Sequence, residues 1–239
     1  MLQLERVSVF YGTQQVLWDI DLTIAAGTTV CVLGPNGAGK STVLKAIAGL
    51  VKPRGRILFE GADITRLPAS RRVALGISLV LERRRLFNDL TVRENLELGA
   101  FRASSAERAD RLEDVLGMLP ALRDLLRRQS GDLSGGQQQL VAMGRGLMAK
   151  PRLLMLDEPF LGLSPAAVSE VRSIIENLAG SGLTIVFNEQ NVRLSLAMSQ
   201  AALLLEAGRL VAAAPSEEIA AGSIVQDVYF GTSMESASG

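Results

Sequence analysis

A glycine-rich stretch near the N-terminus has residue types and spacing suited to holding a phosphate. The apolar run TTVCVLG leads directly into GPNGAGKST, which places Gly34, Gly39, Lys40 and Ser41 at the spacing Gly-x-x-x-x-Gly-Lys-Ser. Glycines permit a tight turn in which successive backbone N–H groups face one phosphate, and the helix that follows adds the positive end of its dipole. The alternative is a glycine turn that only caps a helix, but strand, spacing and Lys-Ser pair all agree with a phosphate-binding loop (P-loop).

The P-loop predicts a nucleotide site in more detail. We expect the Lys40 ammonium to reach the β- and γ-phosphates and the Ser41 hydroxyl to ligate Mg²⁺. The order of the glycines differs from the Gly-x-Gly-x-x-Gly of dinucleotide-binding folds, which argues against that class. The loop residues predicted to bind the nucleotide are Gly34, Pro35, Asn36, Gly37, Ala38, Gly39, Lys40, Ser41 and Thr42.

Two carboxylates follow a second apolar run. RLLMLDEP presents Asp157 and Glu158 at the carboxyl end of a predicted buried strand, where α/β sheets bind ligands. Asp157 is expected to hold Mg²⁺ through its water shell, and Glu158 to orient or deprotonate an attacking water. The alternative is an acidic strand end before the loop-breaking Pro159. The P-loop in the same chain favours the catalytic interpretation.

A third motif, LSGGQQQL, begins at Leu133. Ser134 is predicted to cap a helix whose first amides are left bare by Gly135 and Gly136, which makes a second anion site. One P-loop has one γ-phosphate to bind, so this second helix start is expected to bind the nucleotide of a neighbouring subunit. In isolation the motif would be interpreted as a glycine-rich turn before a helix, but all three motifs occur here in order.

The elements that position these residues are those of an α/β protein. Four short apolar runs, TTVCVLG, ISLVL, LLMLD and TIVF, alternate with helical stretches and predict a mostly parallel sheet. Around a break at Tyr11 and Gly12, apolar and polar residues alternate, which predicts a small antiparallel β layer. Its apolar positions are Leu2, Leu4, Val16, Trp18, Ile20, Leu22 and Ile24.

A helical insert is predicted between about residues 91 and 150. Two Ser/Thr-x-x-Glu patterns predict helix starts with capping boxes: Thr91 with Glu94, and Ser104 with Glu107. The apolar positions that follow are Leu96, Leu98 and Phe101 in the first stretch, and Leu112, Val115 and Leu116 in the second.

Composition narrows the classes of protein. With 239 residues, 48% of them hydrophobic, the chain has the material for a sizeable core. Twenty-five Lys and Arg balance 25 Asp and Glu, so no overall field draws the chain onto nucleic acid or an anionic membrane. The single Cys31 excludes an internal disulfide framework, fits a reducing compartment and is predicted to be buried. We expect no secretory signal, no spanning helix of about 20 apolar residues, and a loose tail TSMESASG.

With these motifs the chain resembles the ATP-binding cassette (ABC) ATPases over essentially its whole length. The resemblance implies a P-loop NTPase (RecA-like) core with a mostly parallel sheet, an N-terminal antiparallel β layer and an α-helical subdomain. The corresponding domains are residues 1–90 and 151–231 for the core with its β layer, 91–150 for the helical subdomain ending in the LSGGQ helix, and 232–239 for a flexible tail.

The resemblance also implies ligands and a partner. In this family two cassettes pair head to tail, and each ATP, with Mg²⁺, lies between one P-loop and the LSGGQ of the other subunit. Carried over by residue, the contacts made across the pair are Ser134, Gly135, Gly136 and Gln137. Tyr11 matches an aromatic that stacks on adenine, an interaction worth about 1–3 kcal/mol. The alternative is that Tyr11 is only an aromatic at a strand end.

Three positions depart from the general family pattern. TIVFNEQN places Gln190 where most cassettes have a γ-phosphate-contacting histidine, and the chain has no histidine. An amide still donates a hydrogen bond but carries no imidazolium charge, so we expect weaker stabilisation of the transition state. Glu82 stands where a glutamine usually monitors Mg²⁺ and water, and Ser164, before Pro165, replaces an aspartate.

A narrower resemblance accounts for most of these changes. Glu-x-Arg-Arg-x-Phe before LTVRENLELGA, together with LGLSP and NEQN, is similar to one of the two ATPase subunits of branched-chain amino acid importers. Asn188, Leu81 and Arg83 depart from that pattern. The triplet Arg83, Arg84 and Arg85 is interpreted either as a solvated loop or as a contact with a cytoplasmic helix of a membrane subunit.

The predicted function is ATP hydrolysis that powers uptake of branched-chain or related amino acids. Glu158, Lys40 and Gln190 are the predicted catalytic residues, Ser41 and Asp157 the metal ligands, and Glu82 the coupling residue. Expected partners are membrane-spanning permease subunits, a second cassette that is more often a homologue than a copy, and indirectly a solute-binding protein outside the membrane; nucleic acid is not expected. The expected location is the cytoplasmic face of the cell membrane, as a peripheral subunit.

Several alternatives stay open. The same ATPase role for urea, short amides or another polar solute fits the residues, because the solute passes through other polypeptides. A regulatory cassette with weak hydrolysis is the second alternative, and the presence of Glu158 argues against it. A cassette in DNA repair or translation would need a long coiled coil or a second cassette in the chain, and neither is present.

Overall fold

The computed structural model describes residues 1–230. The predicted tail, residues 232–239, lies outside the described residues. Contacts divide the chain into two compact units. One unit contains Met1–Ala69 and the described residues from Thr184 onward, and the other contains Ser70–Leu183. The predicted domains, which join residues 1–90 with 151–231 and separate 91–150, differ from these two units. Their boundaries stay a prediction.

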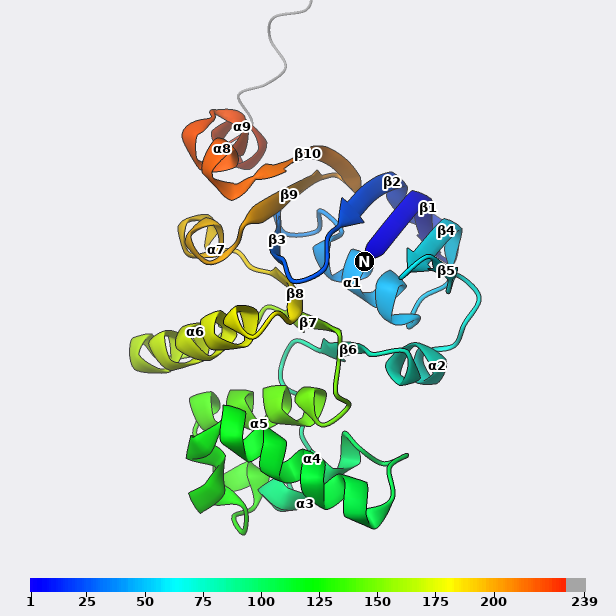
Figure 1. The fold of residues 1–239 in the computed structure, drawn as a ribbon. Helices are drawn as coiled ribbons and strands as arrows, with labels where there is room; N and C mark the ends of the chain where they lie inside the picture. Colours follow the sequence, from blue (N-terminus) through cyan, green and yellow to red (C-terminus); the bar gives the residue numbers. More distant parts are fainter. Residues whose placement is uncertain (231–239) are drawn as a thin grey trace, which may run out of the picture. The chain divides into compact units, whose positions relative to one another are not determined.

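The first unit contains the predicted antiparallel β layer. Its strand order is β2-β1-β4-β5, and β1 pairs antiparallel with both β2 and β4. The strands are β1 (Leu2–Tyr11), β2 (Gln14–Ile24), β4 (Pro53–Phe59) and β5 (Ala62–Asp63). Figure 1 shows β1, β2 and β4 side by side.

One residue of this layer does not follow the predicted alternation of buried and exposed side chains. Trp18 is 39% exposed, whereas its neighbour Leu17 is fully buried. The register changes from Val7 opposite Ile20 to Val9 opposite Leu17, which leaves one extra residue in β2. Such a bulge shifts the side-chain alternation by one position, so a strict period of two fails N-terminal to it. The exposed Trp18 ring instead lies beneath the guanidinium of Arg209, 5.0 Å from it.

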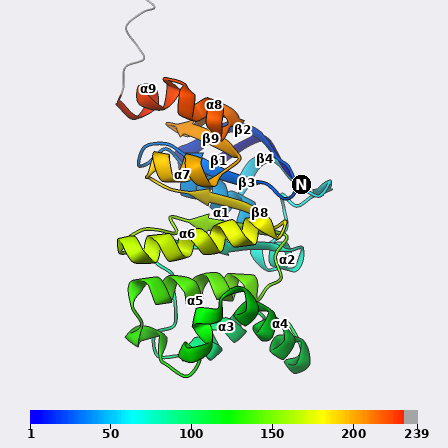
Figure 2. The ribbon, with the colours of Figure 1, turned by 60° about the vertical axis from the view of Figure 1, so that its left-hand side comes forward.

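The same unit contains buried strands in the order β10-β9-β3-β8. The central β3 (Thr29–Leu33) pairs parallel with β8 (Thr184–Asn188) and with β9 (Ala201–Glu206), whereas β10 (Arg209–Pro215) is antiparallel to β9. All five residues of β3 and of β8 are buried, as their nearly continuous apolar sequences predict. The helices of this unit are α1 (Lys40–Ala48), α7 (Val192–Met198), α8 (Ser216–Ala221) and α9 (Ile224–Phe230). Figure 2 shows α8 next to β9, with α9 continuing from it.

The second unit combines two parallel strands with a helical part. β6 (Ile77–Val80) pairs parallel with the fully buried β7 (Leu153–Asp157). The α-helices are α2 (Ala69–Ala74, beginning at the unit boundary), α3 (Val92–Leu98), α4 (Ser105–Met118), α5 (Gly135–Leu147) and α6 (Pro165–Gly180). Two 3₁₀ turns, η1 (Pro120–Leu125) and η2 (Ser130–Asp132), lead into α5. The α5 helix packs against α3, α4 and α6 (Figure 1).

Capping explains where these helices begin. Thr91 and Glu94 form a reciprocal capping box at α3, and Ser104 and Glu107 form one at α4, as predicted. Ser164 caps α6 with Pro165 in its first turn, also as predicted. The α/β class with an antiparallel layer, mostly parallel strands and a helical part is therefore confirmed. Among residues 1–230, none of the helices combines the length and apolarity that a membrane span requires.

Candidate functional site

The P-loop connects the buried β3 to α1 within the first unit. Gly34 has φ +147° and Gly39 has φ +100°, both in the region that favours glycine. A Cβ at Gly34 would collide with the carbonyl oxygen of Leu205, and one at Gly39 would lie 2.6 Å from a methyl of Leu17. Backbone conformation therefore favours glycine at both positions, and the backbone of Leu205 also excludes a side chain at Gly34. This agrees with the turn that the spacing predicts.

Lys40, the first residue of α1, is held by the loop that it follows. Its side chain is only 5% exposed, and its Nζ donates to the carbonyl oxygens of Gly34 at 2.7 Å and Pro35 at 3.1 Å. A buried ammonium needs such partners, because leaving water without them is costly. The lysine is thus oriented over the loop whose amides are predicted to face a phosphate.

Ser41 has a partner that the sequence did not predict. The Asn188 amide, fully buried at the end of β8, donates to the Ser41 hydroxyl oxygen at 3.2 Å. This contact gives the polar residue at the end of TIVFN a structural role. The signal in the sequence was the asparagine itself, which interrupts an apolar strand where the related pattern is aliphatic.

The remaining residues of NEQN divide their tasks. Glu189 is buried and its carboxylate accepts the backbone N–H of Gln190 at 3.0 Å, while Asn191 caps α7 by accepting from Leu194 N at 3.0 Å. The Gln190 side chain is exposed, in the same unit as the P-loop. Tyr11, at the end of β1, is 45% exposed, which leaves its ring accessible.

In the second unit the acidic pair follows the buried strand β7. Asp157 is 4% exposed, and Glu158 has φ +51°. A left-handed conformation in a residue other than glycine costs about 1–3 kcal/mol and is concentrated at functional sites. The backbone therefore turns sharply at the residue predicted to activate water.

The LSGGQ motif forms the start of α5. Ser134 Oγ accepts from Gln137 N at 3.3 Å, and Gln137 Oε1 accepts from Ser134 N at 3.1 Å, which completes a capping box. The cap by Ser134 was predicted, but the reciprocal bond from Gln137 was not. A Cβ at Gly136 would lie 2.8 Å from the Cβ of Ala167, so this glycine allows α5 to approach α6. As the serine oxygen is used as an acceptor, its O–H remains the donor it can offer an anion.

The loop after β6 carries Glu82 and the three arginines. Arg83, Arg84 and Arg85 all have positive φ, at +60°, +60° and +45°. Glu82 forms an ion pair with Arg83 at 3.2 Å, and both side chains are solvent-accessible. The triplet is therefore not uniform, because Arg84 is directed into the unit.

Arg84 links three parts of the second unit. Its guanidinium donates to Gln138 Oε1 on α5 and to the Leu161 carbonyl after β7, both at 3.4 Å. Its own carbonyl accepts from Arg145 Nη2 at 2.9 Å. The middle arginine thus connects the Glu82 loop with the LSGGQ helix and with the segment that follows Glu158, a role that sequence reasoning missed.

The residues present fit Mg²⁺ in their donor chemistry. Ser41 offers a hydroxyl oxygen oriented by Asn188, and Asp157 offers a carboxylate. Magnesium prefers oxygen ligands and is usually held by one or two protein groups together with phosphate oxygens and water. The two groups belong to different compact units, and each is an oxygen donor of the kind that Mg²⁺ prefers.

Comparison with known proteins identifies relatives over most of the chain. A family profile described as "ABC transporter" matches residues 17–161. The high-affinity branched-chain amino acid transport ATP-binding protein BraG of Pseudomonas aeruginosa is 38% identical over 97% of this chain and 100% of its own length. The probable branched-chain amino acid transport ATP-binding protein LivF of Archaeoglobus fulgidus is 39% identical over 88% of this chain and 90% of its own. The lipopolysaccharide export system ATP-binding protein LptB of Acidithiobacillus ferridurans is 34% identical over 97% of both chains.

Solved structures agree with this result. The ADP conformation of MJ1267, an ATP-binding cassette of an ABC transporter, has a TM-score of 0.88 and 27% identity, over 97% of this chain and 98% of that one. A dimeric post-hydrolysis state of the cassette MJ0796 bound to ADP and Pi has a TM-score of 0.80 and 26% identity, over 90% and 99%. The predicted resemblance is confirmed, and the chain belongs to the ABC transporter family as one of its ATP-hydrolysing cassettes.

Proposed function

We propose that this chain is the ATPase subunit of an importer for branched-chain or related amino acids. The observation that carries the proposal is its similarity to BraG, which extends over 97% of this chain and all of that relative. LivF, whose name also specifies branched-chain amino acid transport, supports it at 39% identity. LptB relatives at 34% identity make lipopolysaccharide export the second candidate.

The chemistry proposed for the site assigns one task to each group. Glu158 orients and deprotonates the attacking water, while Lys40 and Gln190 hold the γ-phosphate. Ser41 and Asp157 are the proposed Mg²⁺ ligands, and the bound ion would neutralise charge on the phosphate oxygens. Tyr11 stacks on adenine, and residues 34–42 bind the phosphates. Residues 134–137 contact the phosphate of the nucleotide bound by a second cassette. Glu82 is the residue of the coupling loop that responds to the nucleotide site.

The proposed partners are permease subunits and a second cassette, with residues 1–90 and 151–231 as the nucleotide-binding core and 91–150 as the helical subdomain. A solute-binding protein contributes indirectly. Exposed aromatics in the second unit support a protein contact, because Phe87 is 58% and Phe101 65% exposed. The chain would then sit at the cytoplasmic face of the membrane as a peripheral subunit.

The first test is ATP turnover by the purified chain over a wide concentration range, with Glu158→Gln and a matched control, Glu170→Gln, at an exposed position of α6. We expect Glu158→Gln to abolish turnover and Glu170→Gln to leave it intact. Specific activity that climbs with protein concentration would show pairing of identical chains. Absence of turnover by the wild-type chain despite ATP binding would mean that it needs a different partner cassette or only regulates one.

The solute is tested by uptake in cells that lack this chain. Restoration of labelled leucine uptake by the wild-type chain, but not by Glu158→Gln, supports the proposal. Uptake that is independent of the chain, combined with a defect in lipopolysaccharide export, would favour the second candidate. Labelled urea provides the test of the remaining polar solutes.

A further inference from the structure

Tyr229, on the C-terminal helix α9, makes a direct hydrogen bond to the first residue of the P-loop. The backbone N–H of Gly34 donates to the Tyr229 hydroxyl oxygen at 2.8 Å, although the two residues are 195 positions apart in the chain. From this contact we infer that Tyr229 is a positioning residue for the P-loop and sets the affinity of the chain for ATP. The inference rests on the ATP site proposed above.

Gly34 is the point at which several constraints on the loop meet. Its N–H is bonded to Tyr229, and its carbonyl oxygen accepts from Lys40 Nζ at 2.7 Å. A Cβ at Gly34 would collide with the carbonyl oxygen of Leu205, and its φ of +147° is available mainly to glycine. The conformation of Gly34 therefore depends on bonds at both its N–H and its carbonyl, and the carbonyl bond fixes the catalytic lysine.

Glycine needs this support more than other residues do. Because it lacks a Cβ, it has a wide choice of backbone conformations, and only its neighbours select one of them. Gly34 is also buried, so its N–H would find no water if the tyrosine hydroxyl were removed. The loop would then either keep an unsatisfied donor or rearrange at its first residue.

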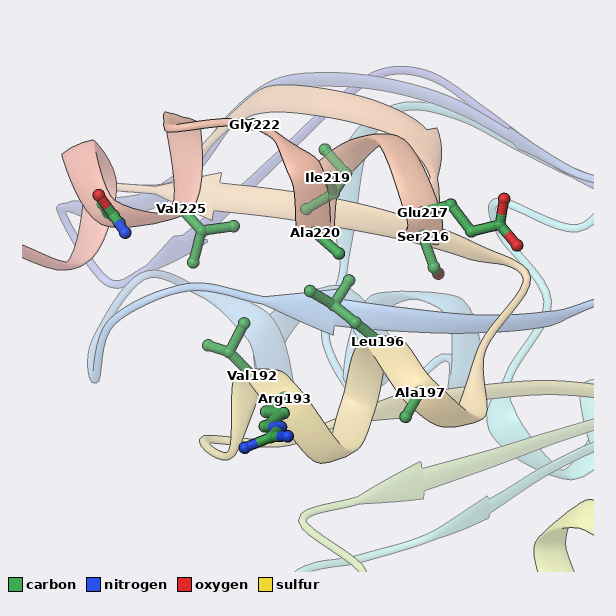
Figure 3. Close-up of a pocket in the computed structure, with 11 residues that line it drawn as sticks. Val192, Arg193, Leu196, Ala197, Ser216, Glu217, Ile219, Ala220, Gly222 and Val225 are labelled. Atoms are coloured by element: carbon green, nitrogen blue, oxygen red, sulfur yellow. The ribbon is translucent and has the colours of Figure 1, made fainter.

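The α9 helix is seated so that the tyrosine can reach the loop. Val225, one helical turn before Tyr229, points towards Val192 and Leu196 of α7 across an apolar groove of about 470 Å³ (Figure 3). Residues four apart lie on the same face of a helix, so Tyr229 leaves α9 on this inward face. The phenol is half-buried, and burial raises its pKa above the ordinary value of 10.0.

The direct test is Tyr229→Phe in the full-length chain, which removes one oxygen and keeps the ring. We expect the Kd for ATP to rise about 5-fold, the scale of one net hydrogen bond, with kcat at saturating ATP within about 2-fold of wild type. The matched control is Gln226→Ala, an exposed residue on the same helix, which should leave both quantities unchanged. Thermal unfolding of each variant separates lost affinity from lost folding.

Each outcome is decisive. An unchanged Kd in folded Tyr229→Phe overturns the inference, as does an equal loss in Gln226→Ala. If Tyr229→Phe fails to fold, hydrogen exchange of the Gly34 amide in the wild-type chain decides instead, because a fast-exchanging amide rules out the bond. If Lys40→Ala binds ATP as tightly as the wild-type chain does, the proposed ATP site itself is wrong, whatever the result for Tyr229.

Discussion

Asn188 shows how a side chain far away in the sequence acts on a residue of the P-loop. Its buried amide donates to the hydroxyl oxygen of Ser41, the proposed Mg²⁺ ligand. Groups that hydrogen-bond to a metal ligand fix its orientation, and their loss typically costs 10- to 100-fold in metal affinity.

We therefore expect Asn188→Val to reduce the benefit of Mg²⁺ for ATP binding by about 10-fold, at the lower end of that range. The measurement is the Kd for ATP with Mg²⁺ and with excess chelator, by titration calorimetry. Only the value with Mg²⁺ should change. An equal loss under both conditions would mean that Asn188 supports the loop as a whole rather than the Ser41 hydroxyl.

The turn of the P-loop could be predicted at this scale, but the side chains that support it could not. Gly34, Lys40 and Ser41 lie close together in sequence, and their spacing predicts a backbone turn suited to a phosphate. Asn188 and Tyr229 reach the same loop from 147 and 195 positions away. No local pattern encodes a contact that exists only after distant strands and helices have packed.

Two helix starts in the second unit have the same geometry and different proposed duties. Ser104 at α4 and Ser134 at α5 each accept from the N–H three residues later at 3.3 Å. Replacing either serine with alanine should cost about 1 kcal/mol of unfolding free energy, the usual value for a lost N-cap.

Only Ser134→Ala should also lower ATP turnover, because only Ser134 is proposed to contact the nucleotide of a second cassette. Chemical denaturation and steady-state turnover of both variants test this. Equal turnover in Ser104→Ala and Ser134→Ala would remove Ser134 from the proposed site and leave it with a structural role.

Replacing two glycines of the helical part with alanine is expected to change stability in opposite directions. A Cβ at Gly99, at the end of α3, would collide with the backbone carbonyl of Arg145 on α5, whereas one at Gly117 in α4 meets open space. Gly99→Ala should lower the unfolding free energy by about 1–3 kcal/mol through overpacking. Gly117→Ala should raise it by about 0.5–1 kcal/mol, because alanine favours a helix.

Denaturation midpoints of the two variants provide the comparison. Stability gained in both would mean that α3 and α5 can separate at little cost, contrary to the close approach that the structure shows.

Elements were predictable where one local rule dominates. Continuous apolar runs identified β3, β7 and β8, and capping boxes identified the starts of α3 and α4. The predicted alternation failed at Trp18 because a bulge is set by pairing with another strand rather than by the strand's own sequence. The fold class therefore followed from the sequence, whereas individual side-chain directions at irregular positions did not.

The titratable groups of the whole molecule predict how its stability responds to pH. The chain has no histidine, and the pKa of the buried Cys31 thiol is raised to about 11 by desolvation. Ordinary side chains other than histidine do not change charge between pH 6 and 8. The unfolding free energy should therefore be nearly constant in this range.

Stability should then fall in acid. Hydrogen bonds from Thr91 lower the pKa of Glu94 below 4.5, and those from Ser104 do the same for Glu107. A carboxyl with a lowered pKa in the folded state contributes stability above its unfolded pKa of 4.5, and this contribution is lost as pH falls through the lower folded value. Urea denaturation from pH 8 to pH 3 measures both parts. A titration centred near pH 6.5 would contradict the prediction.

The grip of the P-loop on its own lysine has a consequence for which anions the chain recruits. The Lys40 ammonium is already bonded to two peptide carbonyls, so an anion that binds it shares the lysine with these oxygen acceptors. Weakly basic anions such as chloride offer little advantage over those carbonyls, whereas a doubly charged phosphate group offers a great deal. We therefore expect the two backbone carbonyls, as well as the charge of the ammonium, to favour phosphate over chloride at this loop.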